Sequence, residues 1–307
     1  MTTVVDIHAH VIVPGLGAEV AWEDGKQVVR FAGKEIRAAV REFVDLDRIL
    51  DEQDRAGVDR VVLCPWVTLL GREPDRQNEA LAGLVGERIA VLGTVDPARP
   101  ETLGELLADG RLSGVEIAAS VEGDYLGHER FRDFWAAAEE TQALVFVHPT
   151  TRGFDLPVFD DYYLWNAVGN PMETTVTAAH MVMAGVLEAH PRLRVVLAHG
   201  GGAVLALRGR LRHAHSFQPQ ARARLRESPD DSLRRFYYDT VTHDETLLRA
   251  LVDFAGTDRV LLGSDYPFDM GLERPADPVH ALGLSSEDEA AVLGGNALRL
   301  LGQGVRS

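Results

Sequence analysis

The chain has 307 residues, of which 46% are hydrophobic, so it is long enough to bury a large core. Acidic residues outnumber basic ones by 47 to 31, and the net charge of −16 argues against a nucleic-acid partner. The single cysteine, Cys64, excludes an internal disulfide. We find no leader-like segment and no apolar run of membrane length, and therefore expect a cytoplasmic protein without a membrane partner.

Eight short apolar runs alternate with helical patterns along the chain. Most are continuous stretches of aliphatic and β-branched residues, which is typical of parallel strands covered by helices. The predicted strands are Thr3–His8, Asp59–Pro65, Ile89–Val95, Gly114–Ala119, Ala143–Pro149, Leu193–His199, Phe236–Thr240 and Arg259–Asp265.

The segments between these runs carry apolar residues at helical spacing. In Asp45–Ala56, Leu46, Ile49 and Leu50 share one face, and Gly57 follows as a C-cap. The other predicted helices are Gln77–Gly86, Thr102–Leu107, Glu129–Thr141, Thr174–Ala189, Ala203–His213, Asp244–Phe254 and Ser286–Leu301. This alternation predicts an α/β protein with a (β/α)₈ TIM barrel, as a single domain over residues 1–307. A doubly wound sheet is the alternative, but the glycine-rich fingerprint usual after an early strand is missing.

Two connections are too long for ordinary loops after a strand. They are Val11–Val44, after the first predicted strand, and Thr150–Asn170, after the fifth. Both leave the C-terminal ends of strands, where barrel enzymes carry their active sites. We therefore expect both connections to shape the mouth of the barrel and its substrate specificity.

Histidine or aspartate residues lie at the C-terminal ends of four predicted strands. His8 and His10 project from the same face of the first strand, because their spacing matches the period of a strand. The other strand ends supply His148, His199 and Asp265. These ends meet at one barrel mouth, so we predict a metal site there. Imidazole and carboxylate ligands suit Zn²⁺, with Fe²⁺, Co²⁺ or Mn²⁺ as alternatives, and we expect no organic cofactor.

Four motifs span residues 6 to 268. They are Asp6-Ile7-His8-Ala9-His10, Val147-His148-Pro149, Ala198-His199-Gly200-Gly201-Gly202 and Gly263-Ser264-Asp265-Tyr266-Pro267-Phe268. In them the chain resembles the amidohydrolase superfamily, and within it the decarboxylase branch typified by aminocarboxymuconate-semialdehyde decarboxylase. Gly295-Asn296-Ala297 resembles the closing helix of this family, so the resemblance covers nearly the whole chain.

The resemblance implies a role for each residue of the centre. The implied ligands of one metal ion are His8, His10, His148 and Asp265. His199 would lie beside the ion and transfer a proton, so the implied catalytic residues are His199 and Asp265. Glu116 lies on the fourth predicted strand, where related binuclear enzymes carry a bridging ligand. We favour one metal, with Glu116 paired to a neighbouring polar group.

The resemblance also implies substrate-binding residues and an oligomer. Arg37 aligns with an arginine that binds a substrate carboxylate, and Trp165 and Phe268 fall at the mouth. Arg210, eleven residues after His199, matches an arginine that reaches a neighbouring subunit's site. A homodimer acting on a small carboxylic acid is therefore implied. The alternative to substrate binding, for both Arg37 and Arg210, is that each is a solvent-exposed surface residue.

The implied activity is non-oxidative decarboxylation of an unsaturated or aromatic carboxylic acid, a carbon–carbon lyase reaction. The alternative is a hydrolase or hydratase that uses metal-bound hydroxide on a lactone, an amide or the double bond of a keto-diacid. A non-catalytic metal-binding protein is the third hypothesis, and it would leave His199 and the two long connections without a purpose.

Overall fold

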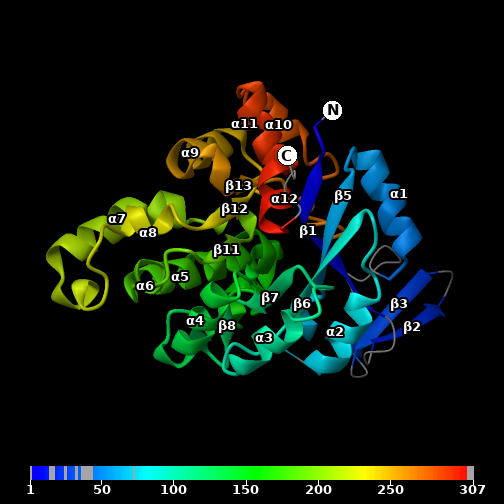
Figure 1. Cartoon of the computed structure of the whole chain (residues 1–307), viewed down its shortest axis with the longest axis horizontal. Helices are drawn as coiled ribbons and strands as arrows, with labels where there is room; N and C mark the ends of the chain where they lie inside the picture. Colours follow the sequence, from blue (N-terminus) through cyan, green and yellow to red (C-terminus); the bar gives the residue numbers. More distant parts are fainter. Residues whose placement is uncertain are drawn as a thin grey trace.

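The computed structural model describes residues 2–13, 18–23, 26–31, 34–35, 44–71 and 73–302. Among them, eight parallel strands form a nearly closed barrel (Figure 1). Their order is β1 (Val5–Val11), β5 (Arg60–Pro65), β6 (Ile89–Thr94), β7 (Gly114–Ala118), β10 (Leu144–His148), β11 (Arg194–Leu197), β12 (Tyr237–Asp239) and β13 (Val260–Leu261). The Ile7 amide donates to the Leu262 carbonyl at 3.0 Å, and Ala9 pairs with Tyr266, so β1 meets the last strand. The predicted (β/α)₈ barrel is confirmed.

Helices follow the strands as the alternation predicts. The Asp45 side chain caps α1 by accepting from the Arg48 amide at 3.2 Å, and Gly57 ends this helix with a left-handed φ of 76°. The α-helices are α1 (Leu46–Ala56), α2 (Pro74–Ala82), α3 (Glu101–Leu107), α4 (Arg132–Glu140), α5 (Asn170–Met183), α6 (Val186–Ala189), α7 (Val204–Phe217), α8 (Pro229–Leu233), α9 (Glu245–Ala255), α10 (Asp277–Ala281), α11 (Ser286–Ala290) and α12 (Asn296–Leu300).

Shorter elements fill several connections. The helical turns are η2 (Val67–Leu69), η3 (Glu129–Phe131), η7 (His199–Gly201), η8 (Pro219–Arg222), η9 (Thr257–Arg259) and η10 (Ala291–Gly295). A small hairpin of β8 (Ser120–Val121) and β9 (Asp124–Tyr125) follows β7.

The hydrophobic core has an inner and an outer part. Inside the barrel, the buried side chains of Ile7, Leu92 and Phe146 belong to one cluster with Ala297 and Leu300 of α12. Helix α12 contacts β1 and β13 and closes the end of the barrel at which the strands begin. Two further clusters, one of them much larger, pack the outer strand faces against the surrounding helices. Because the lower interior is filled, only the C-terminal ends of the strands are left to form a site.

The two long connections contain more structure than the sequence indicated. The first holds an antiparallel sheet of β2 (Ala18–Glu23), β3 (Lys26–Phe31) and β4 (Lys34–Glu35). The second holds η4 (Pro157–Phe159), η5 (Asp161–Tyr163) and the π-helical turn η6 (Trp165–Gly169). These short strands and turns are formed by local backbone hydrogen bonds, and the apolar periodicity that predicts the barrel does not indicate such bonds.

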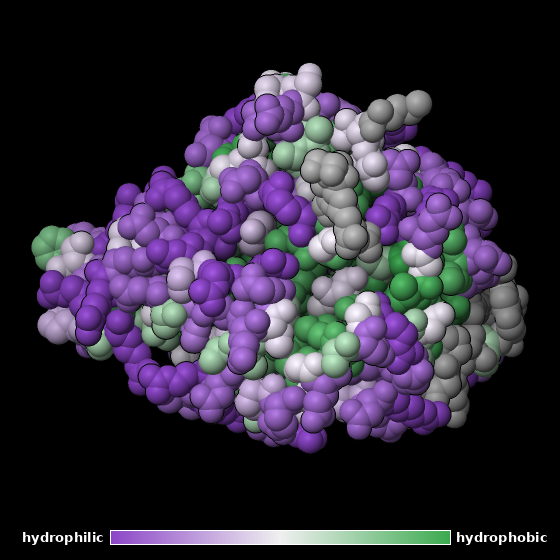
Figure 2. Space-filling model, viewed as in Figure 1, coloured by the Kyte–Doolittle hydropathy of each residue, from purple (hydrophilic) through white to green (hydrophobic). Residues whose placement is uncertain are grey.

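Helices α7 and α8 extend away from the barrel on one side (Figure 1). Val204 is the single buried residue of α7, all of which is described. Hydrophilic residues cover most of the face in Figure 2, including the region of these helices. Within the described part of the chain, no helix has the length and apolar character needed to cross a membrane.

Candidate metal centre

Four buried side chains converge at the C-terminal ends of the strands. His8 and His10 come from β1, His148 ends β10, and Asp265 follows β13. One donor atom from each lies within 4.8 Å of the others. The Nε2 atoms of His8 and His10 are 3.1 Å apart, and they lie 3.2 and 3.4 Å from Asp265 Oδ1. The structure thus brings together the four residues that the resemblance implied as metal ligands.

The unpartnered nitrogen of His148 shows that this cluster suits a cation. Its Nδ1 lies 2.8 Å from the Pro149 carbonyl oxygen, which can only accept, so Nδ1 carries the proton. Its Nε2 is buried and, among the described residues, has no hydrogen-bond partner. Donor atoms around one tetrahedral ion with bonds of about 2.0–2.2 Å lie about 3.3–3.6 Å apart. The donor set, the 3.1–3.4 Å spacing of the His8, His10 and Asp265 donor atoms and the free lone pair of His148 fit one divalent metal ion.

Charge balance keeps the aspartate ionised. Burial would raise the pKa of Asp265, but the charge of His8 and hydrogen bonds from neighbouring histidines hold it well below its usual range. Burial would lower the pKa of His8, but Asp265 and Asp239 raise it to about 10. Burial lowers the pKa of His10 and of His148, so both rings are neutral and can act as ligands.

Asp239, which the sequence analysis did not single out, organises this centre from β12. Its Oδ2 accepts from His8 Nδ1 at 2.7 Å and from the His199 amide at 3.0 Å. Its Oδ1 accepts from the amides of Gly200 at 2.7 Å and Val241 at 3.1 Å. Burial would raise its pKa, but the hydrogen bond and charge of His8 lower it. One carboxylate therefore orients an implied metal ligand and fixes the backbone of the implied proton-transfer residue.

A second buried carboxylate, Asp6, joins the first and last segments of the centre. It accepts from the His8 amide at 3.0 Å, and from the Ser264 amide and hydroxyl at 3.0 and 2.5 Å. Burial raises the pKa of Asp6 to about 6, although these hydrogen bonds lower it. The sequence motif included Asp6 but indicated no role. The structure shows that it holds the segment before Asp265 against β1.

His199 lies beside the cluster and reaches solvent. Its Nε2 is 3.5 Å from Asp265 Oδ2, and its ring centroid is 5.1 Å from that of His148. Its side chain is 13% exposed, whereas those of His8 and His10 are fully buried. The backbone of His199 has a φ of 56°, a left-handed conformation found at functional sites. This position suits a group that exchanges protons with both substrate and water.

Gly202 explains why glycines follow His199. Its φ is 64°, and a Cβ atom there would lie 2.0 Å from the Pro171 carbonyl oxygen. Any larger residue would push the His199 turn away from α5. The close approach of two backbones accounts for this glycine.

Glu116 lies on β7 and is fully buried. Within the described ranges, neither of its carboxyl oxygens has a hydrogen-bond partner. Burial raises its pKa well above the usual range, so the group is neutral. The expected pairing with a neighbouring polar group is not seen, and Glu116 is not part of the four-residue cluster.

Of the four implied substrate-binding residues, the three that the structure describes are not gathered at one place. The Phe268 ring packs 4.9 Å from the His10 ring and 5.2 Å from the Trp66 ring, next to the cluster. Trp165 begins η6, and the Arg152 guanidinium lies 3.8 Å from its ring centroid. Arg210 is exposed on α7 and forms no ion pair within the described residues. Arg37 lies outside the described residues.

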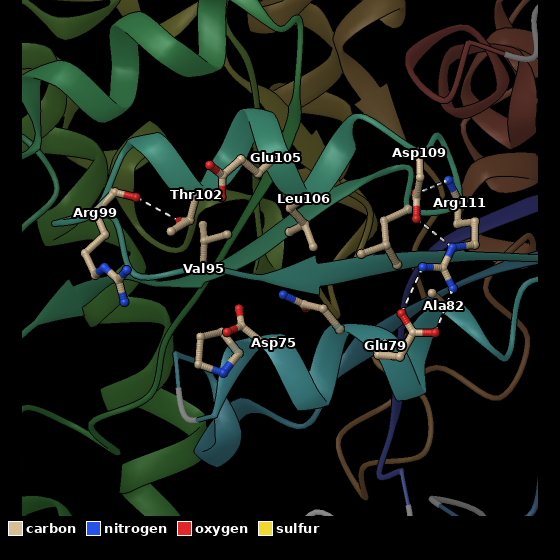
Figure 3. A pocket seen from close by; sticks show the side chains of 13 residues that line it. Asp75, Glu79, Ala82, Val95, Arg99, Thr102, Glu105, Leu106, Asp109 and Arg111 are labelled. Atoms are coloured by element: carbon tan, nitrogen blue, oxygen red, sulfur yellow. Dashed lines mark hydrogen bonds and ion pairs between the residues drawn. The ribbon is translucent and has the colours of Figure 1, made fainter.

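A separate crevice of about 290 Å³ lies between α2 and α3 (Figure 3). Arg111 spans one end, with Nη2 2.9 Å from Glu79 Oε2 and Nε 2.7 Å from Asp109 Oδ2. The rim also includes Asp75, Arg99 and Glu105. No member of the metal cluster lines it. This crevice belongs to the helical layer over β6 and is separate from the metal cluster.

The barrel and the buried histidine–aspartate centre are those of a metal-dependent barrel enzyme. Residues 5–303 match the family described as Amidohydrolase, and the chain therefore belongs to the amidohydrolase family. It is 29% identical to 2-amino-3-carboxymuconate-6-semialdehyde decarboxylase of Dictyostelium discoideum, over 97% of this chain and 91% of that relative. With this relative and other decarboxylases of the superfamily, it belongs to the carboxy-lyase branch.

Solved structures support the same fold. A 5-carboxyvanillate decarboxylase from Sphingomonas paucimobilis superposes with a TM-score of 0.82 at 22% identity, covering 98% of this chain and 99% of that one. The Novosphingobium aromaticivorans 5-carboxyvanillate decarboxylase, complexed with manganese, gives a TM-score of 0.80 at 17% identity, covering 98% and 96%. The (β/α)₈ barrel is thus shared along the whole chain.

Proposed function

We propose that this protein is a metal-dependent, non-oxidative decarboxylase of an unsaturated or aromatic carboxylic acid. The observation that carries the proposal is the cluster of three histidines and one aspartate beside the partly exposed side chain of His199. A divalent ion held by His8, His10, His148 and Asp265 would bind the substrate carboxylate and an adjacent oxygen and polarise them.

His199 supplies the proton in this proposal. The bond between the carboxyl group and the substrate carbon breaks, carbon dioxide leaves, and the carbon takes a proton from His199 Nε2. The ring regains that proton from solvent through its exposed edge. Asp239 holds the His199 backbone, so the nitrogen stays aimed at the reacting carbon. Phe268 next to His10 offers an apolar surface for a planar substrate.

The test is a screen of the purified, metal-loaded enzyme against muconate semialdehydes, hydroxybenzoates and keto-diacids. Carbon dioxide release and substrate absorbance are followed together, with the His199→Ala variant as the background. We expect equal amounts of carbon dioxide and consumed substrate for at least one acid. Consumption of substrate without carbon dioxide would contradict the decarboxylase proposal and favour the hydrolase or hydratase.

We propose Zn²⁺ as the bound metal, because three imidazoles and one carboxylate suit it. The same donors accept Mn²⁺, the ion bound in the Novosphingobium structure. Elemental analysis of protein purified without added metal decides between them. A preparation with manganese and no zinc would overturn the choice of ion but leave the site intact.

We also propose a homodimer in which each active site borrows Arg210 from its neighbour. Residues 204–226 contain six arginines and no acidic residue, in a chain with a net charge of −16. This arginine-rich segment on the extended α7 would be attracted to the acidic body of a second copy. Arg37, as a second carboxylate-binding arginine, completes the proposal.

Mixing two inactive chains tests the shared site. Arg210→Ala and His199→Ala subunits are each expected to be inactive alone. Their heterodimer would contain one site with both groups, so part of the activity should return. No recovery in demonstrated heterodimers would leave Arg210 as an ordinary surface residue.

A further inference from the structure

Arg152 is a positive charge at the mouth that the proposed chemistry has not used. It lies four residues after His148, in the segment that leaves the C-terminal end of β10. Its guanidinium lies 3.8 Å from the Trp165 ring centroid, a cation–π contact. In the part of the chain that the structure describes, no carboxylate pairs with it. In a strongly acidic protein, this leaves its hydrogen-bond donors available to an anionic ligand.

Glu173 fixes the backbone that leads to Arg152. This buried α5 carboxylate accepts from the Thr150 amide at 3.0 Å, the Thr151 amide at 2.8 Å and the Thr151 hydroxyl at 2.7 Å. The same hydroxyl accepts from the Phe154 amide at 2.8 Å. Arg152 itself has a left-handed φ of 54°. Hydrogen bonds before and after Arg152 therefore hold its backbone in a strained conformation, and such strain is common at ligand-binding positions.

Two glycines close the segment into a loop. A Cβ atom on Gly169 would lie 2.6 Å from Gly153 Cα, so the two backbones touch. Residues 153–169 thus form a compact loop with adjacent ends, of the kind that often carries function. This closure brings Trp165 back to the start of the loop, where its ring supports Arg152.

The loop is also tied to the opposite side of the mouth. The Tyr163 hydroxyl donates to Asp269 Oδ1 at 2.6 Å, and the Tyr163 ring lies 5.0 Å from the Trp165 ring. Asp269 lies four residues after Asp265. Since β11 and β12 separate β10 from β13, this contact crosses that sector of the mouth. Arg152 and Trp165 thus belong to a stretch of chain that joins the segments following two of the cluster residues.

We infer that Arg152 is a specificity-determining residue that binds a second anionic group on the substrate, remote from the carboxylate at the metal centre. The inference rests on the proposed function of the same site. A guanidinium can donate two parallel hydrogen bonds to a carboxylate, and stacking on Trp165 limits its orientations. The substrate class is therefore a planar dicarboxylic acid. An acid with only an apolar substituent at this position gains nothing from Arg152.

Calorimetry with unreactive probes tests this without requiring turnover. Benzene-1,3-dicarboxylate and benzoate are titrated into the metal-loaded wild type, Arg152→Gln and Arg152→Lys. Arg60→Gln is the matched control, because Arg60 begins β5 at the other end of the barrel and also lacks an ion pair within the described ranges. We expect Arg152→Gln to weaken dicarboxylate binding on the order of 10- to 100-fold and benzoate binding less than about 2-fold. Arg152→Lys should give an intermediate loss, and Arg60→Gln none.

Three results would overturn the role of Arg152. They are equal weakening of both probes, no weakening of the dicarboxylate, or a wild type that binds the dicarboxylate no more tightly than benzoate. Kinetics give a second measurement, since the KM of a dicarboxylic substrate should rise while kcat stays nearly constant. An enzyme that decarboxylates no acid but discriminates the probes would refute the proposed function alone. An enzyme that decarboxylates a monoacid but does not discriminate between the two probes would refute only the proposed role of Arg152.

Discussion

The metal centre differs from the compact loop of residues 153–169, here called the mouth loop, in how the fold holds it. His8 and His10 lie on a barrel strand and are 0% exposed, whereas Val158 and Tyr162 in the mouth loop are 71% and 91% exposed. The strand positions are fixed by neighbouring strands and a filled interior. The loop depends on a few side-chain anchors, chiefly Glu173 and the Tyr163–Asp269 bond. In the proposed function, the residues of the reaction are therefore placed by barrel topology, and the residues of substrate selectivity by local contacts.

The largest effect should come from removing a strand-borne metal ligand. His148→Ala takes away the only group of the cluster that comes from β10, together with its free Nε2. We expect bound metal to fall from about one equivalent to nearly none and activity to reach background. Elemental analysis, with circular dichroism as a folding control, measures this. Full metal content in a folded variant would remove His148 from the ligand set.

His199→Ala should separate catalysis from metal binding. His199 lies beside the cluster and is not one of its four members. We expect kcat to fall about 10²–10⁴-fold, the usual effect of losing a general acid or base, while metal content stays unchanged. Simultaneous loss of metal and activity would show that His199 is a ligand instead.

Asp239→Asn tests whether the hydrogen bonds from His8 and the His199 backbone to Asp239 contribute to metal binding. An amide cannot accept from His8, His199, Gly200 and Val241 at once, because one of its two terminal atoms only donates. We expect about 10- to 100-fold weaker metal affinity, measured by chelator competition. Asp230→Asn is the matched control, since Asp230 is buried but pairs with Arg208 and Arg212 far from the cluster. Equal losses of affinity in both variants would contradict a specific role for Asp239.

Tyr163→Phe should have the smallest effect and act on binding alone. It removes the hydroxyl that joins the loop to Asp269 but keeps the ring beside Trp165. We expect KM to rise about 2- to 10-fold with kcat unchanged, as for the loss of one exposed hydrogen bond with a net worth of about 0.5–1.5 kcal/mol. Tyr162→Phe is the control, because Tyr162 is the adjacent residue and its side chain is almost fully exposed. A large fall in kcat would show that the loop takes part in the chemistry.

The sequence predicted what repeats along the chain and missed what depends on single distant contacts. The strand ends at His8, His148 and Asp265 follow from barrel periodicity, and the structure brings these residues together. Asp239 ends a strand of three residues and meets His8 across 231 positions, so no local pattern points to it. The β2–β3 pairing and the stacking of Arg152 on Trp165 arise inside connections, where apolar periodicity carries no information.

The contact between β1 and the last strand has a consequence for the order of folding. Ile7 and His10 take their outer backbone partners from Leu262 and Tyr266, which are synthesised more than 250 residues later. Until then the strand that carries two of the cluster histidines has an open edge, and Asp265 does not yet exist. The nascent chain therefore cannot hold the complete metal cluster before nearly all of it has been made. Assembly of the centre and closure of the barrel are one late event in the life of the protein.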